Sequence, residues 1–222
     1  MKKLFLISLL AVIAFLPACN KAGIIGPGVV SVASSSNSYQ PTTSGSVWKY
    51  VNEVTGKPDE LIMVKAVGTT FNINNRVYYT ITSASSLNGT TTNYYFTNGV
   101  FYTIRGASLV PGATSEFQYL DNSYTVGTKW TVSVNDSGFI NGVAGRFEGS
   151  TVEKDITKTI GDNTFTNVIH TTVNLEFDYG DGFVTTATYD YYLAKSIGMI
   201  EVDSSVAGVV VGKETITSYD VK

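Results

Sequence analysis

Hydrophobic and polar residues alternate along much of this chain, which is the pattern of a β-strand that buries one face. In residues 165–177 the odd positions, Asn167 included, are predicted to face the core, whereas the even positions are mostly polar. Residues 183–193 repeat this pattern, with Phe183 on the predicted inner face. The sequence Asp-Tyr-Gly-Asp-Gly at 178–182 is typical of a turn, so the two segments predict one long hairpin.

A second hairpin is predicted around Thr-Asn-Gly at 97–99, where Asn-Gly supplies the positive φ angles of a type I′ turn. Further strands are predicted at 47–51, 61–67, 76–81, 116–120, 129–134, 145–153, 197–202, 208–211 and 214–219. Several predicted strands exceed ten residues, or about 33 Å, and no helical spacing interrupts them. We therefore predict an all-β domain over 45–222, built as a single large antiparallel sheet that is half-barrel or barrel-like, with a sandwich as the alternative.

Two of the predicted strands begin alike. The sequence Gly-Ser-Val-Trp ends at Trp48, and Gly-Thr-Lys-Trp ends at Trp130. Both tryptophans are expected to anchor one core at equivalent ends of their strands. An ancient duplication and a coincidence both explain this similarity.

The N-terminus has the pattern of a targeting segment. Lys2 and Lys3 precede an apolar run at 4–16, which as a helix spans roughly 20 Å and is too short for a bilayer core of about 30 Å. We interpret residues 1–18 as a signal peptide. The sequence Leu-Pro-Ala-Cys that ends at Cys19 resembles the lipobox of bacterial lipoproteins. This resemblance implies that Cys19 is the first mature residue and carries the lipid anchor.

The segment after Cys19 is rich in Ser, Gly and Pro, and Lys21 is its only charged residue up to position 44. We therefore predict that residues 19–44 are the lipidated cysteine and a tether. By the same resemblance, Asn20 indicates sorting to the outer membrane. The expected location is the bacterial cell envelope, with the lipid bilayer as a partner through Cys19, and the facing of the domain stays open.

The sequence Tyr-Tyr-Leu-Ala-Lys-Ser-Ile-Gly-Met-Ile at 191–200 resembles a motif of secreted β-rich Bacteroidetes lipoproteins of unknown function. In those proteins a strand ends in Tyr-x-Ala-Lys and a new strand begins after a glycine. Together with the strand at Trp48 and the last strand near Tyr219, the similarity covers most of the domain. It implies kinship in fold and no particular activity.

The composition of the chain argues against several kinds of binding site. The chain has 222 residues, with 15 Lys and Arg against 18 Asp and Glu, so its net charge of -3 does not favour binding to nucleic acid. One His and one Cys cannot complete an ordinary zinc site or form a disulfide within the chain. No cofactor is expected.

Three groups of residues could carry chemistry. His170 lies on the polar face of its predicted strand, where an exposed structural role is the simplest interpretation. Asp178 and Asp181 share the predicted turn and form a weak candidate for a Ca²⁺ site. The same two residues, or Glu148 with Glu153 on one predicted strand, are candidates for the carboxylate pair of a hydrolase. The sequence lacks the Gly-x-Ser-x-Gly motif of a serine nucleophile, so we do not expect an enzyme.

Tyrosine pairs are the third group. Adjacent aromatic residues in a strand point to opposite faces, so one ring of each pair is expected in the core and the other outward or in a cavity. Tyr94, Tyr102 and Tyr192 are the candidates for contacts to a ligand.

The sequence thus predicts a membrane-anchored envelope lipoprotein whose non-catalytic β-domain binds a glycan or an envelope protein. One alternative is a carrier of a lipid or another apolar ligand in a barrel-like interior. A second alternative is a carboxylate-dependent hydrolase.

Overall fold

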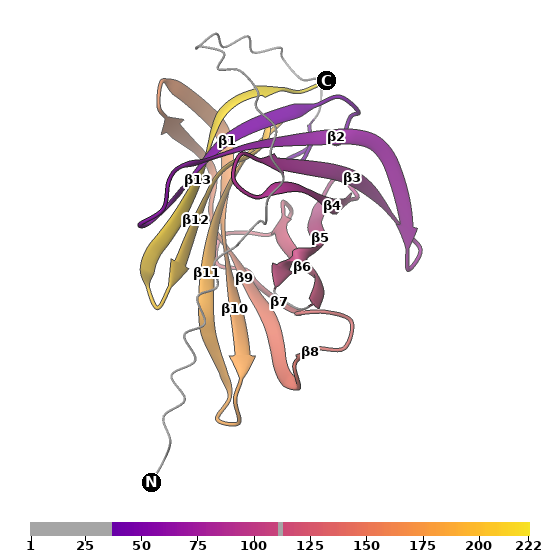
Figure 1. Ribbon diagram of the computed structural model, residues 1–222, viewed down its shortest axis with the longest axis vertical. Coiled ribbons are helices and arrows are strands. Elements are labelled where there is room, and N and C mark those ends of the chain that lie inside the picture. The colour runs from indigo at the N-terminus through magenta and orange to yellow at the C-terminus, as the bar shows by residue number, and fades with distance from the viewer. Residues whose placement is uncertain (1–36, 111–112) are drawn as a thin grey trace.

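The computed structural model describes residues 37–110 and 113–222, and all of its regular structure is β-strand (Figure 1). The strands are β1 (Val47–Val54), β2 (Glu60–Ile73), β3 (Arg76–Ser85), β4 (Gly89–Thr97), β5 (Phe101–Val110), β6 (Ala113–Asp121), β7 (Lys129–Ser133), β8 (Phe139–Ile140), β9 (Val143–Ile160), β10 (Asn163–Asp178), β11 (Phe183–Ala194), β12 (Gly198–Val206) and β13 (Val209–Asp220). In the described part of the chain, no helix is long and apolar enough to cross a membrane. Cys19, the signal peptide and most of the predicted tether lie outside the described residues.

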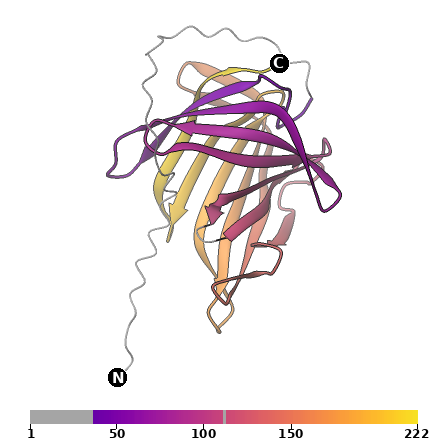
Figure 2. The same cartoon turned by 45° about the vertical axis from the view of Figure 1, so that its right-hand side comes forward.

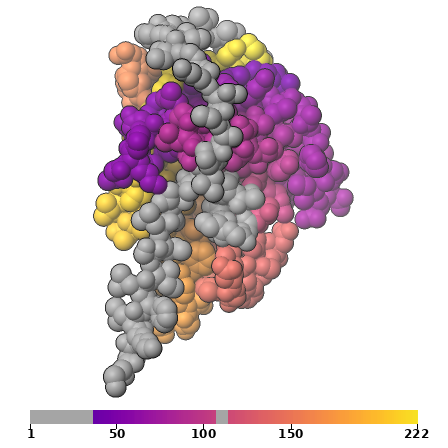
Figure 3. All heavy atoms as spheres, in the orientation of Figure 1, coloured from indigo at the N-terminus to yellow at the C-terminus, as the bar shows by residue number. Residues whose placement is uncertain are grey.

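All strands belong to one antiparallel sheet in the order β6-β5-β4-β3-β2-β1-β13-β12-β11-β10-β9-β7, with β8 paired to β9. The sheet curls until its two ends face each other, so the predicted all-β, barrel-like fold is confirmed (Figures 1 and 2). The β2–β3 and β10–β11 hairpins project from the body of the molecule (Figure 3). Because the strands form one sheet, the alternative of a two-sheet sandwich is not realised.

The sheet consists of two six-stranded meanders. Strands β1 to β6 form the first, strands β7 and β9 to β13 form the second, and the pairing of β1 with β13 joins them. Each meander opens with the same local structure: the Gly45 amide donates to Ala66 O at 3.0 Å, and the Gly127 amide donates to Thr151 O at 2.8 Å. The similar strand starts in the sequence therefore occupy equivalent places in a repeated topology.

The two tryptophans pack in different parts of the core, which corrects the expectation of one shared cluster. Trp48 is buried beside Tyr50 and Ile200, in a cluster between β1, β2, β12 and the start of β10. Trp130 is buried with Phe147 in the other cluster, under β5, β6 and β9 to β11.

Strand β6 does not close the barrel by pairing with β7. Instead it lies across the inner face of β9 and β10, where the Thr171 hydroxyl donates to Tyr119 O at 2.7 Å. The Trp130 indole donates to Gln118 O at 3.4 Å. Side chains of β7 and β10 thus take the place of a neighbouring strand, and β6 fills much of the interior with its own aromatic rings.

Two bulges shift the predicted alternation. Asn167 has φ 52° and is exposed, while Val168 is fully buried in its place. A second irregularity follows Leu175, so Phe183 lies on the outer face, with its ring 4.0 Å from the Arg146 guanidinium. The predicted inward positions of Asn167 and Phe183 are therefore wrong.

Two further predictions change in detail. In the turn at 97–99 only Gly99 has a positive φ, 88°, so the turn is not type I′. The Asn98 side chain instead accepts hydrogen bonds from the amides of Val100 and Phe101. The predicted strands at 208–211 and 214–219 belong to one strand, β13, which begins at Val209 and continues through Gly212.

Part of the predicted tether packs on the domain. Tyr39, Gln40 and Pro41 are buried, and the Tyr39 amide donates to the Tyr102 hydroxyl at 3.2 Å. The Ser196 amide donates to Ser38 O at 2.8 Å. The packed domain therefore begins several residues before position 45.

Candidate functional site

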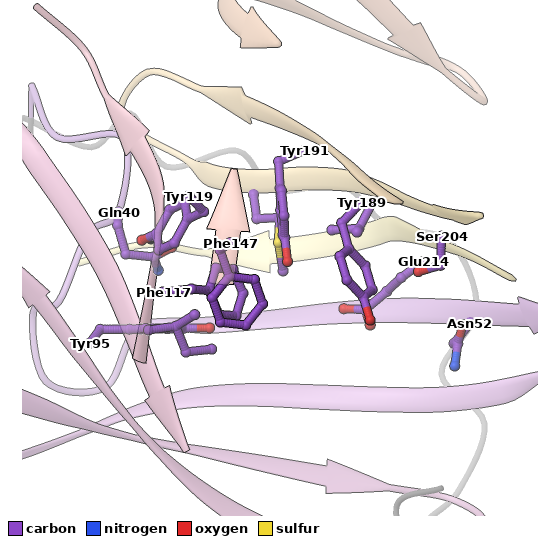
Figure 4. A pocket seen from close by; sticks show the side chains of 13 residues that line it. Gln40, Asn52, Tyr95, Phe117, Tyr119, Phe147, Tyr189, Tyr191, Ser204 and Glu214 are labelled. Carbon is purple, nitrogen blue, oxygen red and sulfur yellow. Dashed lines mark hydrogen bonds between the residues drawn. The ribbon is translucent and has the colours of Figure 1, made fainter. Parts of the chain in front are cut away.

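A cavity of about 140 Å³ lies between the two meanders and is partly open. Figure 4 shows Gln40 and Tyr119 at one end and Asn52 and Ser204 at the other, with aromatic rings between them. The lining residues are Gln40, Asn52, Tyr95, Ile104, Phe117, Tyr119, Phe147, Tyr189, Tyr191, Met199, Val202, Ser204 and Glu214. A cavity of about 150 Å³ is known to hold one benzene, so this space accommodates a single ring-sized group.

The cavity walls are interlocked rings from both meanders. The Phe117 ring of β6 lies 5.0 Å from Phe147 of β9 and 6.0 Å from Tyr191 of β11. Tyr119 lies 5.9 Å from Tyr191 and 6.4 Å from Tyr95 of β4. Rings at these separations support each other, which gives the cavity a preformed shape. The inward turn of β6 therefore builds one wall of the site.

Glu214 is the only ionisable acid or base, apart from tyrosines, among the described residues that line the cavity. It faces Asn52 across the β1–β13 pairing, and Asn52 faces Glu60 across the β1–β2 pairing. Desolvation, and secondarily the charge of Glu60, raises the pKa of Glu214 from 4.5 to about 7. Near neutral pH this carboxyl is therefore divided between its charged and neutral forms.

The two neighbouring carboxyls differ in their partners. Glu60 is buried and accepts hydrogen bonds from Asn52 at 3.0 Å, from Asn88 at 2.7 Å and from the Ser85 hydroxyl. Glu214 makes no hydrogen bond or ion pair with the described residues, and only Glu214 lines the cavity. Most glycosidases use a pair of carboxyls at the bond that they cleave, and the described lining of this cavity contains one.

The predicted division is confirmed for the pairs Tyr94–Tyr95 and Tyr191–Tyr192, but in each pair the ring that lines the cavity is not the predicted one. Tyr95 and Tyr191 line it, whereas Tyr94 and Tyr192 lie on the outer face of the sheet. Tyr94 packs edge-on against Phe71, with ring centres 5.5 Å apart.

Tyr102 is fully buried in the core and does not line the cavity. Its hydroxyl donates to Gly99 O at 3.0 Å and accepts the Tyr39 amide at 3.2 Å. It therefore fastens residue 39 and the β4–β5 turn to the domain.

His170 is on the outer face, as predicted, but it is buried, with 9% of its surface exposed. Its Nδ1 lies 3.2 Å from Glu153 Oε2, and its Nε2 lies 3.0 Å from Asp190 Oδ1. The Tyr192 ring stacks on it at 4.3 Å. The hydrogen bond to His170 lowers the pKa of Asp190, although desolvation opposes this shift. His170 thus belongs to a structural network of hydrogen-bonded polar side chains on the outer face.

Asp178 and Asp181 lie in the exposed β10–β11 turn. One Asp178 oxygen accepts the amides of Gly180 at 2.8 Å and Gly182 at 3.1 Å, so this side chain stabilises the turn itself. Within the part of the chain that the structure describes, no group of three or more His, Cys, Asp or Glu could hold a metal ion.

A polar cluster between β3, β5 and β6 was not foreseen from the sequence. The Tyr78 hydroxyl lies 2.8 and 2.7 Å from the two Glu116 oxygens, and Arg105 lies 3.3 Å from Glu116. Burial, and then the bond to Glu116, raises the pKa of Tyr78 to about 12. The cluster borders an open hollow of about 380 Å³ beside Asp136. All its charged groups have partners, so we assign it a structural role.

Glu214 and Tyr95 were also missed as site residues. Glu214 is two residues before the buried Ile216 on β13, so both side chains point to the same face of the strand. Alternation therefore already places an acid on the core face. For the Tyr94–Tyr95 pair, alternation separates the two rings but does not say which of them points inward.

Comparison with known proteins yields similarity in structure only. No protein-family model matches the sequence, and no curated protein matches it. A crystal structure described as that of a putative lipoprotein from Parabacteroides distasonis is 11% identical, covers 84% of this chain and 100% of its own, and has a TM-score of 0.49.

A second crystal structure, of a putative exported protein with a YmcC-like fold from Bacteroides fragilis, is 9% identical. The match covers 81% of this chain and 97% of that one, with a TM-score of 0.50. This likeness concerns the fold alone, and it agrees with the resemblance to β-rich Bacteroidetes proteins seen in the sequence at 191–200. The chain therefore shares the YmcC-like fold of that Bacteroides fragilis protein.

Proposed function

We propose that this chain is a cell-envelope lipoprotein, anchored in the outer membrane through Cys19, whose β-domain binds a small ligand in the cavity between its two meanders. The observation that carries the proposal is the preformed cavity, whose wall is mostly apolar, includes six aromatic rings and contains one carboxyl without a partner among the described residues. Binding sites for small molecules typically combine an apolar wall with a few polar groups of this kind.

The volume sets the size of the ligand. At about 140 Å³ the cavity is smaller than the roughly 300 Å³ of common drug-sized sites. It suits one compact apolar group, either a whole small molecule or the end of a larger one that enters through the open side. Transport of a whole lipid chain in the interior is not favoured, because β6 and its rings occupy that space.

The binding test uses a methionine as its reporter. The chain has three methionines; Met199 lines the cavity, whereas Met63 is exposed on the outer face of β2. We would label the methionine methyl groups with ¹³C in the full chain, held in lipid nanodiscs, and add benzyl alcohol as a probe.

Saturable binding in the cavity is expected to shift the Met199 methyl signal through the nearby rings and to leave Met63 unchanged. Val202→Phe, which fills the cavity, is expected to abolish the shift. If Met199 stays unmoved, or moves equally in the Val202→Phe chain, the binding function is refuted.

The anchor is tested separately. Cells labelled with radioactive palmitate are expected to yield a labelled protein in the outer-membrane fraction, and Cys19→Ser is expected to lose both the label and the membrane association. A labelled protein in the inner-membrane fraction would refute the outer-membrane part of the proposal.

A second candidate function is glycan binding on the outer face. It is favoured by Phe71, which is 55% exposed and packs against Tyr94, because exposed rings of this kind can stack on sugars. Cosedimentation with purified envelope polysaccharide should then fall with Tyr94→Ala and should be unaffected by Val202→Phe.

A further inference from the structure

The described lining of the cavity contains an acidic side chain, Glu214, and no basic side chain to balance its charge. Among the described residues, the titratable groups that interact electrostatically with Glu214 are acidic or neutral. The charge of Glu60 on β2 raises the pKa of Glu214, and Glu214 in turn raises the pKa values of Tyr50, Tyr95 and Tyr191. No Lys, Arg or His is among the described residues of the lining. Glu214 is half-buried. When it is ionised, its charge is not compensated by the wall and is only partly hydrated, which is unfavourable.

The aromatic rings that line the cavity with Glu214 favour a positively charged ligand. Aromatic rings carry negative potential on their faces and attract cations that approach within about 6 Å. Tyr95, Tyr189 and Tyr191 line the same cavity as Glu214, and the rings of Phe117 and Phe147 continue the wall. A carboxylate combined with several rings resembles the chemistry that recognises alkylated ammonium groups.

The same wall suits a metal ion poorly. Hard cations take six or more oxygen ligands at short distance. Among the described residues, no group of three or more His, Cys, Asp or Glu could hold a metal ion, and Glu214 is the only carboxyl of the described lining. An alkylammonium group spreads its charge over a surface of carbon and hydrogen, needs no such ligand set, and has about the size of the cavity. The wall thus matches an organic cation in charge, in surface and in volume.

We propose that the cavity binds an alkylammonium group, with its positive charge against Glu214 and its alkyl surface against the rings of Tyr95, Tyr189 and Tyr191. This inference rests on the proposed binding function and adds the chemical class of the ligand. The group could come from a free small amine or from the headgroup of a choline-type lipid.

The test compares choline with 3,3-dimethyl-1-butanol, which has nearly the same shape but no charge. Both are titrated at pH 8 into the full chain in phosphatidylglycerol nanodiscs, and the Met199 methyl signal is followed against that of Met63. Choline is expected to bind about tenfold more tightly than the alcohol. At pH 5 Glu214 is neutral, so the preference should shrink.

Two variants separate charge from ring contacts. Glu214→Gln should remove most of the preference for choline at pH 8 while keeping the binding of the alcohol. Tyr189→Leu keeps an apolar wall but removes one ring, so it should weaken choline more than the alcohol. An unchanged Met63 signal in both variants reports that the fold is intact.

The outcomes discriminate between the two proposals. If the alcohol binds as tightly as choline at pH 8, the cation proposal is overturned and the cavity remains a binding site for neutral ligands. If neither probe moves Met199, both proposals fail. In nanodiscs that contain phosphatidylcholine, a shifted Met199 signal without added choline would identify the lipid headgroup as the source, and an unshifted signal would identify a free amine.

Discussion

Replacement of Glu214 by Gln should stabilise the protein at alkaline pH. Glu214 is held in an aromatic cavity without a partner among the described residues, and its pKa is raised from 4.5 to about 7. Between these two values the folded protein binds more protons than the unfolded chain, so stability falls as the pH rises through this window. The stability that the neutral carboxyl provides is complete below pH 4.5 and is lost above pH 7.

The size of the effect follows from the two pKa values. At about 1.4 kcal/mol for each pKa unit, the wild-type chain should lose about 2.5 kcal/mol of unfolding free energy between pH 5 and pH 8 through this group alone. Glu214→Gln keeps the shape and removes the charge, so this part of the pH dependence should disappear. The variant should gain about 1 M in its urea midpoint at pH 8 relative to wild type, and much less at pH 5.

The assay is urea unfolding of both chains at pH 5 and pH 8, followed by tryptophan fluorescence. Glu53→Gln is the matched control, because Glu53 is an exposed acid on β1, the strand that pairs with β13. It should change the pH dependence of stability very little. The unfolding free energy of each chain is compared between pH 5 and pH 8. If it changes by the same amount in Glu214→Gln and in wild type, Glu214 is not the desolvated group that the structure describes.

Three further predictions concern packing and the turn. A Cβ atom at Gly149 would lie 2.1 Å from the Trp130 ring, so Gly149→Ala should cost about 3 kcal/mol in chemical unfolding, and a loss under 0.5 kcal/mol would contradict this packing. Thr171→Val removes the hydroxyl that binds Tyr119 O and should cost about 1 to 2 kcal/mol, with faster amide exchange in β6; unchanged exchange would refute its role in holding that strand. Asp178→Ala should lower the thermal midpoint slightly through loss of two turn hydrogen bonds, and added Ca²⁺ should shift neither chain; a Ca²⁺-dependent shift in wild type alone would show a metal site at the turn.

Sequence patterns predict this fold well where one face of a strand is buried over a long distance. The alternation in 165–177 correctly assigns Ile169, Val173 and Phe177 to the core, because each slip of one residue would expose all of them. The same rule fails at Asn167, where a bulge inserts one residue. Such bulges depend on how the partner strand twists, which is information from distant parts of the chain.

The candidate site is harder to predict because it depends on how the sheet closes. The alternation rule states that Tyr94 and Tyr95 point apart, but only the curl of the sheet decides which side becomes the interior. The inward turn of β6 has no local signal, since it results from Thr171 and Trp130 on other strands. Glu214 could have been noticed as an acid on an apolar face, but its contact with the cavity could not.

The repeated topology has a consequence for how the site could arise. Two identical six-stranded meanders that closed a barrel would meet at two identical joints, each between a first and a last strand. Here one joint, β1 with β13, is fully paired, while at the other β6 leaves β7 and enters the interior. As long as two separate copies assemble symmetrically, any change at one joint appears at both. Within a single chain one joint can hold the molecule together while the other departs from symmetry, and the cavity wall formed by Phe117 and Tyr119 is a product of that departure.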